Sequence, residues 1–237
     1  MHPLHNAGVI VTGASRGLGR ALAEALALQG ARLLLIARTD ADLQVVVDGI
    51  RAAGGVAHGL AIDIGAPDAA ARIAGAAAQL IGPVRGIVHN ASSLGPLPLR
   101  PLLDLTGDDF LGVLQVNLLG PFRLTRALAG AMALDGGGWI VHISSDAAVE
   151  GYPTWGAYGV SKAALDHLGR IWAEELRDQG VRFLIVDPGE MDTQMHADAM
   201  PDADPEQLAR PADVAQRLIP LILEHPTGAR HTISEVA

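Results

Sequence analysis

The sequence predicts an α/β protein built on a doubly wound parallel sheet of about seven strands, with helices on both faces. Short apolar runs recur along the chain with helix-compatible segments between them: residues 7–12, 31–37, 56–62, 84–89, 139–144, 181–187 and 229–236. Strands that alternate with helices pair in parallel through right-handed crossovers. A glycine-rich turn joins the first run to the first helix, as expected for the first crossover of such a sheet.

The length of 237 residues fits one domain, 1–237, because single α/β domains often reach about 200 to 250 residues. Hydrophobic residues make up 49% of the chain, which is enough to bury both faces of a sheet. No apolar run approaches the ~18 residues of a membrane span. Residues 1–6 lead into the first strand without a basic and apolar leader. We therefore expect a cytoplasmic protein with no membrane partner.

Charge and composition argue against two further classes of site. The formal net charge is -9, and no basic stripe is present that would bind nucleic acid. The chain contains no cysteine, and its nine histidines show no His-x-x-x-His or His-Glu-x-x-His spacing. We therefore expect neither a metal site nor a nucleic-acid partner.

The turn after the first apolar run contains the spacing Gly-x-x-x-Gly-x-Gly and precedes a helical run from 20 to 29. Glycines let a backbone approach a pyrophosphate closely, and the start of a helix offers free amide groups to that anion. In this strand–turn–helix context the spacing predicts a dinucleotide site. Its expected ligands are Gly13, Ser15, Arg16, Gly17, Leu18 and Gly19.

The end of the second apolar run indicates which dinucleotide is bound. NAD enzymes usually place an acidic residue there for the ribose hydroxyls, whereas this chain has Ala37 followed by Arg38. NADP(H) is therefore favoured, with Arg38 and Arg16 as partners of the additional phosphate; solvated loop charge is the alternative for both. Asp40 competes as a ribose ligand, but we interpret it as a cap near the start of the helix 42–53.

Tyr158 and Lys162 form the candidate catalytic pair. They stand four residues apart at the start of the helical run 157–177, so both side chains project from one helix face. Lys162 is the only lysine among the 17 Lys and Arg residues, and an ammonium group can change its pKa on burial while a guanidinium cannot. The ammonium should lower the pKa of the neighbouring phenol. Ser145, which follows the run 139–144, brings a hydroxyl to the same place.

Together with the glycine turn, this order of Ser145, Tyr158 and Lys162 resembles the NADP-preferring branch of the classical short-chain dehydrogenase/reductase family. The resemblance covers essentially the whole chain and implies the Rossmann form of the predicted sheet. It also implies that Asn117, within the helix 108–133, bends this helix and holds a water that links the lysine to solvent. A tolerated core asparagine is the alternative.

Further cofactor contacts follow from the resemblance. Asp63 would meet the adenine, or else lie near the start of the helix after residue 67. Asn90 and Ala91 match the family's Asn-Asn-Ala-Gly motif, from which His89 and Ser92 depart. The contacts implied at the nicotinamide end are those of Pro188, Gly189, Thr193, Tyr158 and Lys162.

The resemblance implies an NADPH-dependent reductase that acts on a ketone or aldehyde of a small molecule. Ser145 and Tyr158 would bind the carbonyl oxygen, hydride would come from the nicotinamide, and Tyr158 would give the proton. Lys162 would lower the pKa of the tyrosine and position the ribose. Two rivals are an NAD-linked alcohol dehydrogenase with the same residues and a non-catalytic dinucleotide sensor or scaffold. The family also implies a homodimer or homotetramer, formed through the helices 108–133 and 157–177.

The candidate substrate pocket consists of Tyr152, Trp155 and Met191, beside the catalytic tyrosine. The loop-rich segment 190–210 stands where the family keeps its substrate lid. Between residues 190 and 206 it carries only acidic charges, which are Glu190, Asp192, Asp198, Asp202, Asp204 and Glu206. If these acids face the substrate, neutral or cationic carbonyl compounds should be preferred over carriers with phosphate groups. The alternative is that they face solvent.

Overall fold

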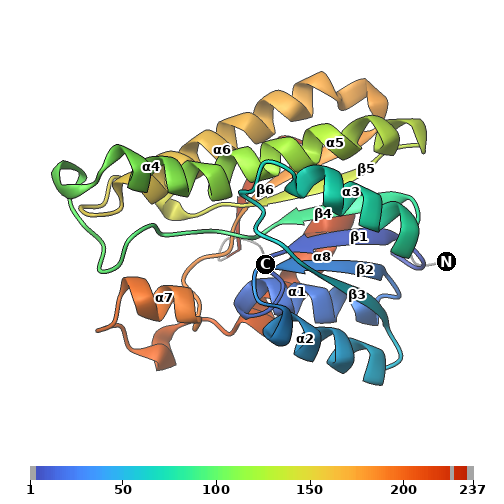
Figure 1. Cartoon of the computed structure of the whole chain (residues 1–237), viewed down its shortest axis with the longest axis horizontal. Coiled ribbons are helices and arrows are strands. Elements are labelled where there is room, and N and C mark those ends of the chain that lie inside the picture. The colour runs from blue at the N-terminus through green and yellow to red at the C-terminus, as the bar shows by residue number, and fades with distance from the viewer. Residues whose placement is uncertain (1–3, 225–226, 234–237) are drawn as a thin grey trace.

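The computed structural model describes residues 4–224 and 227–233, which are arranged around one seven-stranded sheet (Figure 1). Every neighbouring pair of strands is parallel, and the strand order is β3-β2-β1-β4-β5-β6-β7. The strands are β1 (Gly8–Thr12), β2 (Arg32–Ala37), β3 (Val56–Ala61), β4 (Val84–His89), β5 (Gly138–Ile143), β6 (Val181–Asp187) and β7 (Arg230–Thr232). The predicted doubly wound sheet is confirmed. Residues 234–236 of the last predicted strand lie outside the described residues.

Helices cover both faces of the sheet (Figure 1). One face carries α1 (Gly17–Leu28), α2 (Asp40–Ala52) and α8 (Pro211–Glu224), and the other carries α3 (Ala69–Leu80), α5 (Gly120–Leu134) and α6 (Gly156–Glu175). Two further helices, α4 (Gly107–Leu114) and α7 (Gln194–Ala199), lie at the left of Figure 1. Among the described residues, none of the helices is both long enough and apolar enough to cross a membrane.

The strands read as continuous apolar runs because both of their faces are buried. In β2, Leu33 and Leu35 join the core shared with α1, α2 and α8, whereas Leu34 and Ile36 join the core under α3 and α5. All four side chains are at most 1% exposed. The alternating direction of side chains along a strand therefore divides one apolar run between two cores.

The order of the strands switches sides at β1, which pairs with β2 on one side and with β4 on the other. The crossovers that leave this point run in opposite directions, so the carboxyl ends of β1 and β4 border a crevice. In open parallel sheets this switch point is the usual ligand site. The sheet order thus brings the turns after β1, β4, β5 and β6 to one edge.

Three local predictions need correction. Asp40 is not the cap of its helix, because α2 begins at Asp40 itself, and the residue before it, Thr39, makes no side-chain cap hydrogen bond. The helix predicted over 108–133 is interrupted by a π-helical turn, Gln115–Leu119, between α4 and α5. The segment predicted as loop-rich contains α7 and a 3₁₀ turn, Pro205–Gln207.

Candidate active site

A cavity of about 430 Å³ opens at the carboxyl ends of the strands. Its wall contains most residues that the sequence singled out: Gly13, Ser15, Arg16, Gly17, Leu18, Arg38, Asp63, Asn90, Ala91, Ser145, Tyr152, Trp155, Tyr158, Lys162, Pro188, Gly189, Met191 and Thr193. Gly19 and Asn117 do not line the cavity. The structure therefore brings the predicted cofactor, catalytic and substrate residues to one place.

Two glycine positions in this turn, Gly13 and Gly19, cannot accept a side chain without strain or a clash. Gly13 has a φ of +66°, and a Cβ on Gly19 would lie 2.2 Å from the carbonyl oxygen of Gly13. Asn90 Nδ2 donates to the carbonyl oxygens of Thr12 and Gly13 at 3.0 and 3.1 Å. The backbone amides of Asn90 and Ala91 both donate to Thr12 Oγ1 at 3.0 Å. Asn90 therefore fixes the turn against the end of β4.

The start of α1 and two arginines form an anion-binding end of the cavity. No side chain caps α1, and its first turn contains no acidic residue, so its amide groups are left for a ligand. Arg16 and Arg38 are exposed and line this end, and neither forms an ion pair with a carboxylate in the described part of the chain. A guanidinium without a carboxylate partner can bind a phosphate with two parallel hydrogen bonds.

Asp63 lies in the cavity wall after β3, at the adenine end that the resemblance implies. Its Oδ1 accepts a hydrogen bond from the amide of Gly65 at 2.8 Å, which closes a local turn. The N-cap of α3 is Asp68, so the alternative interpretation of Asp63 as a residue at the helix start is wrong.

The two departures from the Asn-Asn-Ala-Gly motif have different structural outcomes. His89 points away from the cavity into the core, where its Nε2 is 2.9 Å from Thr125 Oγ1 and its ring meets the edge of His142 at 5.3 Å. Burial holds the pKa of His89 well below its usual value, so this ring is neutral. Ser92 lines the cavity and has no positive φ, so its backbone accepts a serine without strain.

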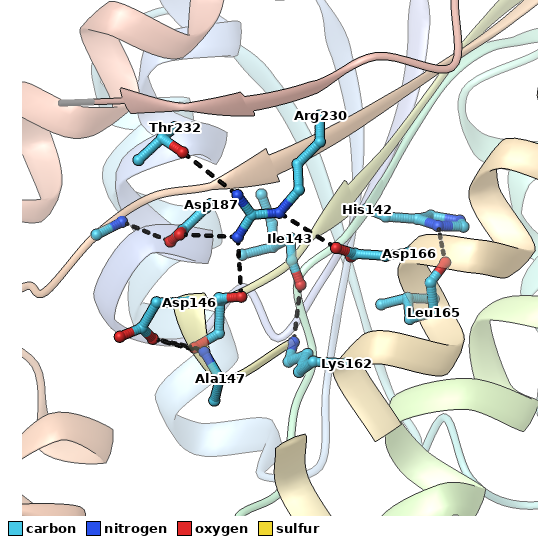
Figure 2. Close-up of polar contacts among 12 residues, drawn as sticks. His142, Ile143, Asp146, Ala147, Lys162, Leu165, Asp166, Asp187, Arg230 and Thr232 are labelled. Atoms are coloured by element: carbon cyan, nitrogen blue, oxygen red, sulfur yellow. Dashed lines mark hydrogen bonds and ion pairs between the residues drawn. The ribbon is translucent and has the colours of Figure 1, made fainter. Parts of the chain in front are cut away.

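Ser145, Tyr158 and Lys162 meet where β5 ends beside α6. Lys162 is 2% exposed, and its Nζ donates to the carbonyl oxygen of Ile143 at 2.7 Å (Figure 2). The same Nζ lies 5.5 Å from the centroid of the Tyr158 ring. The Ser145 side chain lies close enough to the Tyr158 hydroxyl to affect its ionisation. The one-turn spacing thus places both α6 side chains beside the serine, as predicted.

Burial dominates the ionisation of this group. It raises the pKa of Tyr158 to about 12, assisted by the carboxylates of Asp146 and Asp187. Burial also lowers the pKa of Lys162 from 10.5 to about 8, against the upward effect of two nearby carboxylates. The expected net lowering of the Tyr158 pKa by Lys162 is therefore wrong, because burial disfavours the phenolate and the two carboxylates add to that effect.

Asn117 lies in the π-helical turn and is 1% exposed. Its Oδ1 accepts from the amide of Ser93 at 2.7 Å, and its Nδ2 donates to the Ser93 carbonyl and to Ser161 Oγ, both at 2.9 Å. Ser161 Oγ in turn donates to the carbonyl oxygen of Tyr158 at 2.6 Å. The Asn117 side chain therefore joins the loop after β4 to α6. The predicted water link to Lys162 stays a prediction.

The three predicted substrate residues lie together beside Tyr158, the candidate catalytic tyrosine. Trp155 packs edge-on against Tyr158, with the ring centroids 5.5 Å apart. Tyr152 is 44% exposed, and its hydroxyl donates to Asp146 Oδ2 at 2.9 Å. With Met191 these rings form an aromatic and apolar wall next to Ser145.

The segment 190–210 presents methionines to the cavity and most of its acids to solvent. Met191, Met195 and Met200 line the cavity, which accounts for three of the five methionines of the chain. Glu190 is the one residue among the six acids that lines it, and the other five are exposed. The expectation that these acids face the substrate as a group is therefore wrong. Methionine is flexible and polarisable, so this wall can adapt to apolar shapes.

The turn after β6 is shaped by the last residue of that strand. Asp187 Oδ1 accepts from the amide of Gly189 at 3.0 Å, and Gly189 has a φ of +74°. Thr193 caps α7, because its Oγ1 accepts from the amide of His196 at 3.2 Å. A Cβ on Gly17 would lie 3.3 Å from Thr193 Cγ2, so the start of the segment 190–210 lies next to the glycine turn.

Arg230, a residue that the sequence did not single out, connects three of these elements (Figure 2). From β7 it forms ion pairs with Asp166 on α6 at 3.3 Å and with Asp187 on β6 at 3.0 Å. Its Nη2 also donates to the carbonyl oxygen of Ser145 at 3.1 Å. Burial raises the pKa of Asp166, and the guanidinium of Arg230 opposes that shift. The signal in the sequence that could have pointed to Arg230 is Asp166. It lies four residues after Lys162 on the same helix face, and a buried carboxylate needs a cation as its partner.

In the described part of the chain, no group of three or more acidic or histidine side chains is arranged to hold a metal ion.

The family model for short chain dehydrogenases matches residues 7–204. A short chain dehydrogenase of Pseudocercospora fijiensis is 38% identical over 190 residues, which is 79% of this chain and 60% of that protein. This chain thus spans only part of that relative's length.

Two further similarities cover more of the proteins concerned. The oxidoreductase YciK of Escherichia coli is 32% identical over 213 residues, which is 87% of this chain and 82% of that protein. The solved structure of a short chain dehydrogenase of Shigella flexneri complexed with NADP is similar with a TM-score of 0.89 at 28% identity. That similarity covers 98% of this chain and 99% of the other.

The burial of Lys162 predicts a single titration that can be observed directly. Because Lys162 is the only lysine, labelling with ¹³C-lysine gives one side-chain NMR signal. We expect this signal to titrate near pH 8 in the folded protein and near 10.5 in urea, because burial disfavours the ammonium. Asp166→Asn should move the folded titration further down, since it removes a carboxylate that raises this pKa. A folded pKa at or above 10 would contradict the burial of the charge.

The ion pairs of Arg230 predict a large loss of stability when this residue is replaced. Arg230→Met leaves two buried carboxylates unpaired and should lower the free energy of unfolding by about 3 kcal/mol, measured by urea denaturation. Adding Asp166→Asn should recover part of that loss. Arg177→Met is the matched control, because it breaks an exposed pair with Glu174 and should cost less than about 1 kcal/mol. Equal losses for the two arginines would refute the special role of Arg230.

Proposed function

The chain belongs to the short-chain dehydrogenase/reductase family, and from this premise we propose that it reduces a ketone or aldehyde group of a small molecule with NADPH. The observation that carries the proposal is the position of the buried Tyr158 phenol in the cavity wall with Ser145 and Lys162, where burial raises its pKa to about 12 and disfavours the phenolate. A site that stores a proton beside the Ser145 hydroxyl is arranged to give one to an oxygen that gains charge. This favours reduction over alcohol oxidation.

The residues at the other end of the cavity fit NADP(H). The amide groups at the start of α1 and the unpaired guanidinium groups of Arg16 and Arg38 suit a pyrophosphate and an additional phosphate. Arg38 follows β2 where an acid would favour NAD, and the similar Shigella flexneri structure is complexed with NADP. When bound, the nicotinamide supplies the hydride.

In this proposal each residue of the chain has one task. Tyr158 donates a proton to the carbonyl oxygen, and Ser145 orients that oxygen next to the phenol. Lys162 is mostly an ammonium at neutral pH, since its pKa is about 8, and its charge stabilises the phenolate that forms. Asn117 keeps α6 in place through Ser161, next to Lys162 in the chain. Trp155 shields the phenol from one side.

We also propose that the protein is a homo-oligomer that assembles through the face of α4 and α6. Leu111 on α4 and Val160 and Ile171 on α6 are between 43% and 55% exposed, and Leu103 before α4 is 98% exposed. Apolar side chains gathered on neighbouring elements are typical of a contact surface. Light scattering that reports a monomer at micromolar concentration would reject this assembly.

The proposed proton transfer predicts the effect of removing one oxygen atom. Tyr158→Phe should lower kcat by about 10²–10⁴-fold, because it removes the general acid and little binding surface. The dissociation constant of NADPH should stay within a few-fold. Initial rates should be measured with NADPH and NADH in both directions, on a panel of aldehydes and ketones. Retention of more than about a tenth of kcat would show that another group gives the proton.

The proposed cofactor preference predicts the effect of reversing the charge of the residue after β2. Arg38→Asp should weaken NADPH binding about 10-fold or more and leave NADH binding nearly unchanged, because a charged hydrogen bond to the additional phosphate is lost. Fluorescence titration with both dinucleotides measures the change. Arg126→Asp, an exposed arginine of α5 outside the cavity, is the matched control for net charge. An unchanged ratio for Arg38→Asp would assign the preference to Arg16 or to neither arginine.

A further inference from the structure

The carboxylate of Asp146 holds the hydroxyl proton of Ser145. Ser145 Oγ lies 2.8 Å from Asp146 Oδ1, and because an ionised carboxylate can only accept, the serine is the donor. The amide of Ala147 donates to Asp146 Oδ1 at 2.8 Å and to Ser145 Oγ at 3.2 Å, which fixes the two side chains relative to each other. A hydroxyl has one proton, so in this arrangement Ser145 presents lone pairs to the cavity.

This arrangement opposes the binding of a simple ketone. A carbonyl oxygen is also an acceptor, so it gains nothing from the Ser145 hydroxyl until the serine leaves Asp146. The carboxylate then loses a hydrogen bond to a charged group, which is among the stronger classes in proteins. A substrate that brings its own donor to Asp146 avoids that loss.

The surroundings of Asp146 leave its charge without a cation. Asp146 is exposed, lines the cavity, and accepts a second hydrogen bond from the Tyr152 hydroxyl. Within the described residues, no lysine, arginine or histidine forms an ion pair with it. The nearby ammonium of Lys162 is directed to the carbonyl oxygen of Ile143 instead. The carboxylates of Glu150 and Glu190 add to the negative field here, since with Asp146 they raise the pKa of Tyr152.

We propose that Asp146 is a specificity-determining residue that selects carbonyl compounds carrying a protonated amine. The ammonium N–H of the substrate takes Asp146 Oδ1 in place of the serine hydroxyl. The proton of Ser145 then turns to the carbonyl oxygen, so recognition of the cation and alignment of the serine occur together. This inference rests on the proposed carbonyl reduction and names its substrate class.

Three matched probes separate charge from hydrogen bonding. They are a phenyl ketone with a terminal dimethylamino group, its trimethylammonium analogue, which has the charge but no N–H, and its neutral isopropyl isostere. Both kcat/KM with NADPH and the dissociation constant by calorimetry are measured for each probe. We expect the protonated amine to exceed the neutral isostere by about 10-fold or more in both quantities, with the quaternary analogue between them.

Two variants assign this preference to one carboxylate. Asp146→Asn keeps the size of the side chain and removes its charge, so it should reduce the preference for the amine to about twofold or less. Glu150→Gln is the matched control, because it removes a neighbouring charge that lines no part of the cavity, and it should keep most of the preference. Equal binding of the amine and its isostere by the wild type, or an unchanged preference in Asp146→Asn, would overturn the proposal.

The outcomes also separate this inference from the proposed reduction. Turnover of the amine and the neutral isostere at equal rates and affinities would leave the reduction standing and reject the role of Asp146. An Asp146-dependent binding preference without turnover of any ketone would support the recognition of the amine and reject the reduction.

Discussion

The buried ammonium group of Lys162 is the charge around which the site is built. An ammonium with 2% exposure has lost nearly all contact with water, and it donates a hydrogen bond to the carbonyl oxygen of Ile143. Asp166 and Asp187 favour its charged form, but both carboxylates are themselves buried. Arg230 forms ion pairs with both. Two cations and two anions therefore balance at the carboxyl ends of the strands, and removal of Arg230 would leave two buried carboxylates without their ion pairs.

These charges also determine the shape of the backbone above them. Arg230 donates to the carbonyl oxygen of Ser145, and Asp187 accepts from the amide of Gly189. Arg230, which compensates the charges of Asp166 and Asp187, thus also positions Ser145 after β5. Asp187 in turn shapes the turn after β6. Parallel strands make this possible because their carboxyl ends meet at one edge of the sheet. Chain segments that are distant in sequence can there share a single network of hydrogen bonds.

The sequence predicted the features that depend on local patterns. Apolar runs predicted the strands, and the spacing of Tyr158 and Lys162 predicted that both side chains lie on the face of α6 that lines the cavity. Features that depend on how deeply a side chain is buried could not be predicted in this way. The ammonium of Lys162 should lower the pKa of a phenol, but burial of Tyr158 decides the net direction, and burial is a property of the whole fold. Arg230 was missed because a single arginine on a three-residue strand has no periodicity that shows whether it faces solvent or the core.

The two ends of the cavity differ in net charge. Arg16, Arg38 and Asp63 line the end near the glycine turn, and within the described residues neither arginine forms an ion pair, whereas Asp146, Glu190 and the buried Lys162 line the end near Ser145. A dinucleotide phosphate is therefore attracted to the first end and repelled from the second, so one field sets the direction in which the molecule enters. That field acts on every ligand of the cavity. An anionic group of any ligand near Ser145 would meet the same repulsion, so one distribution of charge acts on both the cofactor and the proposed substrate.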